Sequence, residues 1–137
     1  MKKKIMLAAG LIFLLAGFAG YKIWNKPHQD IAAAESFMTI SAIDLLKAFQ
    51  DDETEANARF LNKVLTINGV IRQVKMNKDL PTLDLNTSDD LASVICNFDP
   101  FAEHTTLDFM VGQQIRVKGK CSGMLNDVII DRCVVVE

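Results

Sequence analysis

Apolar residues occupy almost every position from Ile5 to Trp24, and only Lys22 interrupts the run, close to its end. A helix of these 20 residues is about 30 Å long at the usual rise of about 1.5 Å per residue, which matches the hydrocarbon thickness of a bilayer. The pattern therefore predicts a transmembrane signal-anchor over residues 1–26.

Basic residues are denser before this run than after it, with lysines at positions 2–4 against Lys22 and Lys26. The positive-inside bias then leaves the rest of the chain outside the cytoplasm. A cleaved secretory signal is the alternative, although Gly17-Phe18-Ala19 is a poor cleavage site. Phe18 also stands where a lipoprotein would carry its lipidated cysteine, which excludes lipidation there. In either case we expect the folded part to be exported.

The pattern changes to helical spacing after a tether that we place at residues 27–40. Ser41 is a plausible N-cap with Asp44 three residues on, and apolar residues then recur at three- and four-residue spacing as far as Phe49. The acidic residues 51–53 break this pattern and begin a second helix that runs through Phe60. We interpret the acidic residues as a solvated elbow between two short helices rather than a metal site.

Alternating apolar and polar residues predict five strands in the remainder. We place these strands at 64–75, 82–87, 93–98, 114–121 and 128–136. Gly69 indicates a bulge or bend in the first strand, and residues 99–113 are expected to form a loop with a short helical turn that plugs one end of the core. Three strands, a crossover and a hairpin are the order of a five-stranded OB-type barrel. The predicted fold is therefore mainly β, with two short helices before the barrel, an N-terminal transmembrane helix, and a barrel domain over 41–137.

Charge and composition disfavour several functions. All 17 acidic residues lie beyond Lys26, where only 10 of the 15 basic residues lie, so the exported part carries a net charge of −7. Such a domain has no long-range attraction to a phosphate backbone. The chain has two histidines, His28 and His104, and lacks a Ser-His-Asp order, a glycine-rich phosphate loop and paired-cysteine zinc spacing. We expect no enzyme activity, no cofactor and no metal.

Several segments resemble the bacterial tRNA-anticodon-like OB-fold family. They are Lys63-Val64-Leu65 leading to Gly69-Val70, Val94 to Phe98, Gly112-Gln113 with Val117 to Gly123, Asp127-Val128 with Cys133, and Asn25-Lys26-Pro27-His28 after the span. The resemblance covers residues 41–137 and implies an OB barrel that is exported or membrane-attached, with nucleic-acid binding suggested by the fold. From the resemblance together with the predicted anchor and its positive-inside bias, we expect a single-pass protein in the cytoplasmic membrane of a bacterium, with a periplasmic domain.

A basic stripe is the candidate ligand-binding site on such a barrel. It comprises Arg72, Lys75, Arg116, Lys118 and Lys120. Single-strand binding also needs aromatic faces on which bases stack, and the phenylalanines of the predicted helices and strands fall on core positions. We therefore expect a non-enzymatic, membrane-anchored envelope module with an unknown protein partner. Nucleic-acid or oligosaccharide binding is the alternative, and the acidic charge disfavours nucleic acid.

Three cysteines, Cys96, Cys121 and Cys133, follow the span, and export would place them where disulfides persist. A turn near residues 124–126 sets Cys121 opposite about Val128, so Cys133 would lie roughly 17 Å further along, beyond the about 7 Å that a disulfide spans. The third and fifth strands of an OB barrel are neighbours. Cys96–Cys133 is therefore the favoured bridge, and three reduced buried thiols are the alternative.

Overall fold

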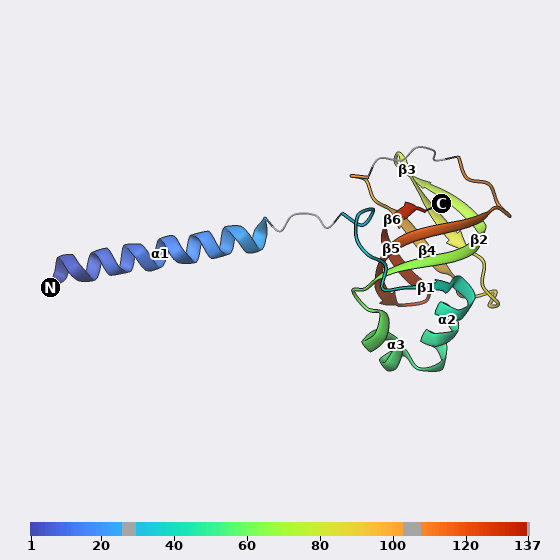
Figure 1. The fold of residues 1–137 in the computed structure, drawn as a ribbon, viewed down its shortest axis with the longest axis horizontal. Coiled ribbons are helices and arrows are strands. Elements are labelled where there is room, and N and C mark those ends of the chain that lie inside the picture. The colour runs from blue at the N-terminus through green and yellow to red at the C-terminus, as the bar shows by residue number, and fades with distance from the viewer. Residues whose placement is uncertain (26–29, 103–107, 137) are drawn as a thin grey trace.

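A computed structural model describes residues 1–25, 30–102 and 108–136. Helix α1 (Lys2–Trp24) stands apart from a barrel domain (Figure 1). Its Ile5–Trp24 part has a mean hydropathy of 1.8 and is long and apolar enough to cross a membrane. Length and composition therefore fit a membrane anchor or a signal sequence.

Two capped helices precede the barrel, as predicted. Helix α2 (Ala42–Asp51) begins at Ser41, whose hydroxyl accepts a hydrogen bond from the Asp44 N–H at 3.0 Å. Helix α3 (Glu53–Phe60) begins at Asp52, whose carboxylate accepts a hydrogen bond from the Glu55 N–H at 3.0 Å. Both caps satisfy amides that a helix start leaves unpaired.

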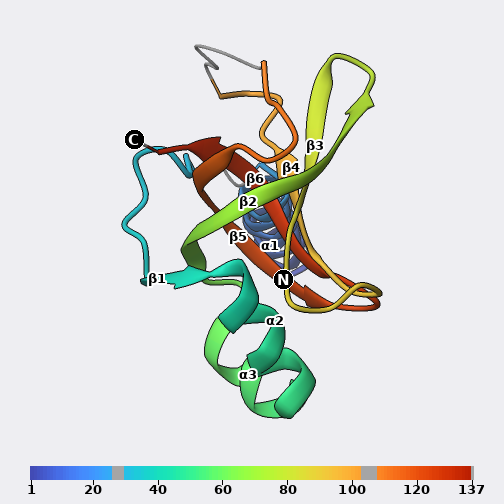
Figure 2. The ribbon, with the colours of Figure 1, turned by 90° about the vertical axis from the view of Figure 1, so that its right-hand side faces the viewer.

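Five strands close into the predicted barrel. They are β2 (Val64–Asn77), β3 (Leu80–Leu85), β4 (Val94–Phe98), β5 (Gln114–Met124) and β6 (Val128–Val135). The order is β2-β3-β4-β6-β5, and β2 pairs again with β5 to close the ring. A sixth strand, β1 (Met38–Ser41), pairs in parallel with β2 outside the ring. Its residues 38–40 lie within the segment that the sequence pattern assigned to the tether. Helices α2 and α3 cover one end of the barrel, and the β2–β3 hairpin projects at the other (Figure 2).

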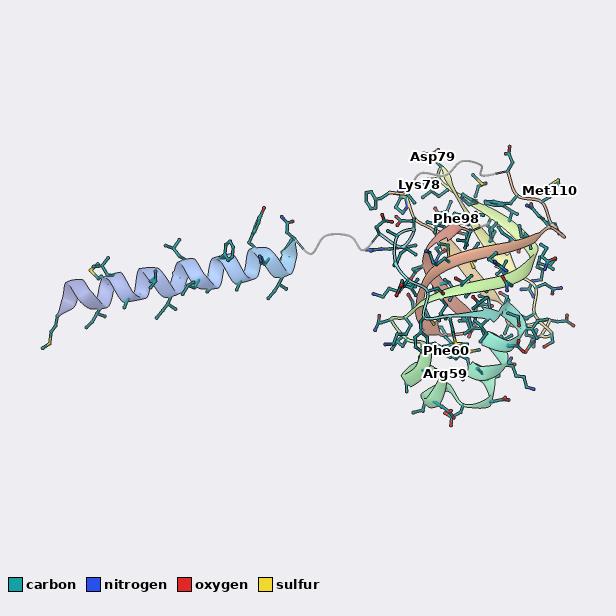
Figure 3. All side chains as sticks on the ribbon, in the orientation of Figure 1. Arg59, Phe60, Lys78, Asp79, Phe98 and Met110 are labelled. Atoms are coloured by element: carbon teal, nitrogen blue, oxygen red, sulfur yellow. The ribbon has the colours of Figure 1, made fainter. Side chains whose placement is uncertain are left out.

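The core fills the barrel and extends to both ends. Phe60 of α3 and Phe98 of β4 lie toward opposite ends, and both are buried (Figure 3). The ring centroids of Phe98 and Phe109 are 5.2 Å apart, so part of the predicted plug segment does pack on the core. Described residues 99–102 and 108–113 contain no helix, and Leu107 and His104 lie outside the described residues.

Irregularities in the strands shape the barrel. Gly69 lies close to α2 and β3: a Cβ there would be 3.1 Å from Leu85 Cδ1 and 3.3 Å from Ala42 Cβ. The bulge that the sequence placed at Gly69 falls slightly later, between Ile71 and Gln73 in the pairing with β3. Glycine at 69 therefore serves close packing, and the strand bends just beyond it.

The hairpin register differs from the sequence prediction. Cys121 pairs with Ile130, not with about Val128, because Val128 lies opposite Met124 and the turn occupies residues 125–127, one position later than predicted. One register shift falls between Cys121 and Gly123. Gly123 takes a φ of 97°, which allows the extra residue to be accommodated. A second shift lies near Arg132, whose φ is 55°. Neither shift was visible in the apolar alternation of this hairpin.

Candidate functional site

The segment that leads into the barrel lies against it from residue 30 onward. Ile31 is only 1% exposed and packs with Val64 of β2 and Val134 of β6 in a small second core. The Asp30 carboxylate accepts a hydrogen bond from the Ala32 N–H at 3.0 Å, which holds a turn. We call residues 30–36 the docked segment.

Lys118 of the predicted stripe fastens the docked segment to the barrel. Its Nζ donates to the backbone oxygens of Ala32 at 2.7 Å and Ala34 at 2.9 Å. On the neighbouring strand β2, the Thr66 hydroxyl donates a hydrogen bond to the Ser36 hydroxyl of the docked segment at 2.9 Å. The chain therefore covers, with its own backbone, the part of β5 on which a ligand was expected.

The other stripe residues fall into two places. Arg116, Lys118 and Lys120 pair with the first half of β2, opposite Asn68, Thr66 and Val64. Arg72 and Lys75 belong to its second half, which pairs with β3. The Arg116 Nε donates to Asn68 Oδ1 at 3.0 Å. The side chains of Lys75 and Lys120 make no hydrogen bond or ion pair within the described part of the chain.

Arg72 is held by an ion pair with Asp84 on the neighbouring strand. The Arg72 Nη2 lies 3.3 Å from Asp84 Oδ2, and the two side chains are 34% and 8% exposed. The other carboxylate oxygen, Asp84 Oδ1, is buried without a hydrogen-bond partner among the described residues. Removing Arg72 would leave a buried charge uncompensated, so this cation has a structural task.

A line of hydrogen-bonded polar side chains crosses β3, β4, β6 and β5. Two of these strands, β3 and β4, are strands two and three of the barrel, whose face commonly binds ligands in OB folds. The Thr82 hydroxyl donates to Asn97 Oδ1 at 3.2 Å, the Asn97 amide donates to Asp131 at 2.9 Å, and the Ser122 hydroxyl donates to Asp131 at 2.6 Å. We call Thr82, Asn97, Asp131 and Ser122 the polar belt. The bonds from Asn97 and Ser122 to Asp131 depend on the register of β4, β5 and β6, which the sequence alternation does not define.

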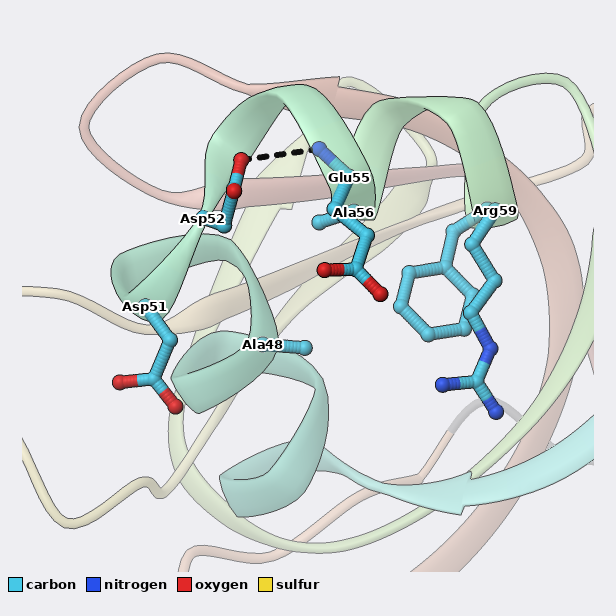
Figure 4. Close-up of a pocket in the computed structure, with 7 residues that line it drawn as sticks. Ala48, Asp51, Asp52, Glu55, Ala56 and Arg59 are labelled. Carbon is cyan, nitrogen blue, oxygen red and sulfur yellow. Dashed lines mark hydrogen bonds between the residues drawn. The ribbon is translucent and has the colours of Figure 1, made fainter.

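A cleft between α2 and α3 is lined by acidic, basic and apolar residues (Figure 4). Asp51, Asp52 and Glu55 border it, and the Arg59 guanidinium lies 5.1 Å from the Phe60 ring centroid. The Asp52 carboxylate is engaged as the cap of α3. Among the residues that the structure describes, no group of three or more His, Cys, Asp or Glu side chains could hold a metal ion.

The cysteines gather in the core. All three are buried and present as free thiols. Burial and the hydrogen-bonded Cys96 thiol raise the pKa of the Cys133 thiol well above its ordinary range, and burial also raises the pKa of Cys121. These are unreactive thiols in the folded barrel, and the Cys96–Cys133 bridge stays a prediction.

Comparisons with known proteins agree with this architecture. A comparison with curated proteins gives no match. Among solved structures the barrel is similar to a "putative nucleic acid-binding lipoprotein" from Klebsiella pneumoniae, with 17% identity and a TM-score of 0.57 over 82% of this chain and 100% of that chain. At this identity the likeness shows the fold alone. The tRNA_anti-like family model matches residues 1–135, which include the apolar helix as well as the barrel, and the chain belongs to the tRNA_anti-like family.

Proposed function

We propose that the protein is a non-enzymatic binding module that α1 holds at the cytoplasmic membrane of a bacterium, with its OB barrel in the periplasm. We further propose that the barrel binds a protein partner, and that single-stranded nucleic acid is not its ligand. The observation that carries the proposal is the engagement of Lys118 by the backbone of the docked segment.

The cations on the barrel support this choice. Arg116, Lys118 and Arg72 each have a partner within the chain, at Asn68, the docked segment and Asp84. A phosphate backbone would have to displace these contacts before it could gain its own. Because the exported part also carries a net charge of −7, electrostatic attraction, which supplies most non-specific nucleic-acid affinity, is absent.

The polar belt also supports a ligand other than nucleic acid. The belt and the adjoining ion pair contain two carboxylates, Asp84 and Asp131, against one cation, Arg72. Base stacking needs exposed aromatic rings on this surface. The aromatic residue of β3 and β4 is Phe98, which is only 5% exposed and packs on Phe109.

Strand β1 offers a surface for a protein partner. Within the described part of the chain it has a strand neighbour, β2, on one side only. An edge of this kind presents backbone donors and acceptors to which an extended peptide can add as a further strand. Thr39 in its middle is exposed.

Fluorescence anisotropy with labelled single-stranded DNA and RNA tests the choice of ligand. We expect affinities weaker than about 1 µM for the full-length protein in detergent at about 0.15 M salt. Lys75→Ala and Lys120→Ala, which remove the two stripe cations whose side chains have no described partner, should change little. Sub-micromolar binding that either variant weakens would replace this proposal with the nucleic-acid function that the name of the Klebsiella neighbour suggests for that protein.

Site-specific photo-crosslinking in living cells tests the partner. A photoreactive residue at Thr39 should yield a discrete crosslinked protein, whereas one at Lys78, on the tip of the β2–β3 hairpin (Figure 3), should not. Equal or absent crosslinking at both positions would argue against β1 as the docking edge.

Protease protection tests the placement in the envelope. The protein should stay with the membrane fraction in high salt and should be digested by protease once the outer envelope is opened, because the domain is expected outside the cytoplasm. Release of the intact protein by salt, or protection until the inner membrane is broken, would contradict the proposed topology.

A further inference from the structure

Cys96 of β4 and Cys133 of β6 meet inside the barrel because of an irregularity between their strands. The two strands pair in parallel, with Cys96 opposite Ile130 and Phe98 opposite Cys133. Between these two pairs the chain advances by two residues in β4 but by three in β6, so β6 contains a bulge. A regular strand would turn position 133 away from the side of Ile130. The bulge returns it to the core, where Cys133, Ile130 and Cys96 are all 0% exposed.

The two sulphur atoms share one closed space. Cys133 Sγ donates to the backbone oxygen of Ile130 at 3.4 Å, and Ile130 is the strand partner of Cys96. The proximity of the Cys96 thiol is also one cause of the raised pKa of Cys133. On the other side lies Gly119 of β5, where a Cβ would be only 2.7 Å from Cys133 Sγ. The missing side chain at 119 therefore leaves the room that the Cys133 sulphur occupies.

Cys121 lies on the other side of strand β6. Its register partner across β5 and β6 is Ile130, which is also the partner of Cys96 from β4. Strand β6 thus separates Cys121 from Cys96. Adjacent strands are about 4.8 Å apart, so a separation of two strands is roughly 10 Å and exceeds the about 7 Å between Cα atoms that a disulfide allows.

We propose that Cys96 and Cys133 form a disulfide in the exported protein and that Cys121 remains a thiol. This inference rests on the periplasmic location proposed above. Two S–H bonds break and one S–S bond forms, while two electrons and two protons pass to an oxidant of the disulfide class, which leaves as two thiols. Because both sulphurs are fully buried in the finished barrel, the exchange takes place on the chain before the barrel closes.

Trypsin separates the three cysteines, which makes the pairing directly measurable. Cleavage after Lys78, Arg116, Lys120 and Arg132 places Cys96 in peptide 79–116, Cys121 in 121–132 and Cys133 in 133–137. The reduced, denatured full-length chain is refolded in detergent with a mixture of glutathione and glutathione disulfide. Remaining thiols are alkylated, and the peptides are analysed without reduction.

We expect peptide 79–116 to be linked to 133–137, with Cys121 alkylated in nearly all molecules. Cys121→Ala should leave this link unchanged, and Cys133→Ala should leave Cys96 and Cys121 unlinked because strand β6 lies between them. A link from Cys121 to either cysteine, or alkylation of all three in the wild-type chain, would overturn the proposal.

Protein taken from cells separates this inference from the proposed location. Cells are quenched in acid and their thiols are alkylated at once. A Cys96–Cys133 link in this sample supports both statements. If the refolded chain carries the link while the cellular protein is fully alkylated, the pairing stands and the periplasmic location fails.

Discussion

Replacement of Lys118 by methionine tests whether this residue is a structural fastener or a ligand-binding cation. Methionine keeps an unbranched apolar side chain that can fill much of the same space but removes the charge and all three donors. The docked segment would lose the hydrogen bonds that the Lys118 Nζ donates to Ala32 and Ala34 at 2.7 and 2.9 Å. Ile31 would still pack on Val64 and Val134.

The expected effect follows from those two bonds. A hydrogen bond to a charged group contributes about 1.5 to 3 kcal/mol when its partner is buried. Ala32 is exposed and Ala34 half-buried, so their carbonyls regain bonds to water, and we expect a total loss of about 1 to 2 kcal/mol. That loss corresponds to a roughly 5- to 30-fold increase in local opening of the docked segment. The barrel itself should keep its free energy of unfolding.

Hydrogen–deuterium exchange on the full-length protein in detergent measures this opening. The Ala34 N–H donates to the backbone oxygen of Asp30 at 3.0 Å, so its exchange reports on the turn. Lys120→Met is the matched control, because Lys120 lies on the same strand, is similarly half-buried and makes no described contact with the segment. Unchanged exchange in Lys118→Met, or an equal increase in Lys120→Met, would refute the fastener role.

Three further outcomes follow from the packing, the thiols and a helix cap. Gly119→Ala should lower the free energy of unfolding by about 2 to 3 kcal/mol in urea denaturation, because its Cβ would lie 2.5 Å from Ile130 Cγ2. Gly69→Ala, with its closest contact at 3.1 Å, should stay within about 1 kcal/mol of wild type, so a reversed order would contradict the contact geometry. Reduced protein should lose stability as the pH rises above 9.0, the ordinary pKa of a cysteine thiol. Burial and the Cys96 thiol raise the pKa of Cys133 in the folded state, so the unfolded chain releases this proton first. Urea midpoints that do not fall between about pH 8 and about pH 10 would contradict this expectation. Asp52→Ala should cost about 1 kcal/mol in thermal or urea unfolding by removing the cap of α3, and an unchanged midpoint would mean that another group replaces the cap.

The proposed disulfide should make the oxidised protein more stable than the reduced protein. Its loop spans 38 residues, counting both cysteines, so the chain-entropy model gives a loss of about 4 kcal/mol on reduction. The oxidised protein should also lack the part of the alkaline destabilisation that comes from Cys133. Measurement of both redox forms in the same urea series therefore separates the bridge from the surrounding packing.

Local patterns were sufficient for most of the fold. The Ser41 cap and its partner Asp44 are three residues apart, and the alternation from Gln114 to Cys121 needs only the two-residue period of a strand. The order of the elements then selects the barrel. Strand β1 was missed because four residues with mixed exposure carry little periodic signal.

The candidate site could not be predicted in the same way. The carbonyl that Lys118 binds at Ala32 lies 86 positions earlier in the sequence, and no local pattern links the two. The Arg72–Asp84 ion pair depends on how β2 and β3 align beyond a bulge. A lysine on an alternating strand has the same sequence signature whether it faces solvent, a phosphate or the protein's own backbone.

The docked segment limits how far the barrel can travel. With α1 across a bilayer, Trp24 and Asp30 are six residue steps apart in the sequence, and a chain of that length spans at most about 20 Å. The barrel would then stay in a thin layer next to the lipid headgroups and would not reach the full depth of the compartment. A partner held in that same layer meets it at a high effective concentration, so modest intrinsic affinity suffices. A soluble partner gains no such advantage. Loss of the Lys118 contacts would release the docked segment, lengthen the connection between α1 and the barrel, and let the barrel move further from the membrane.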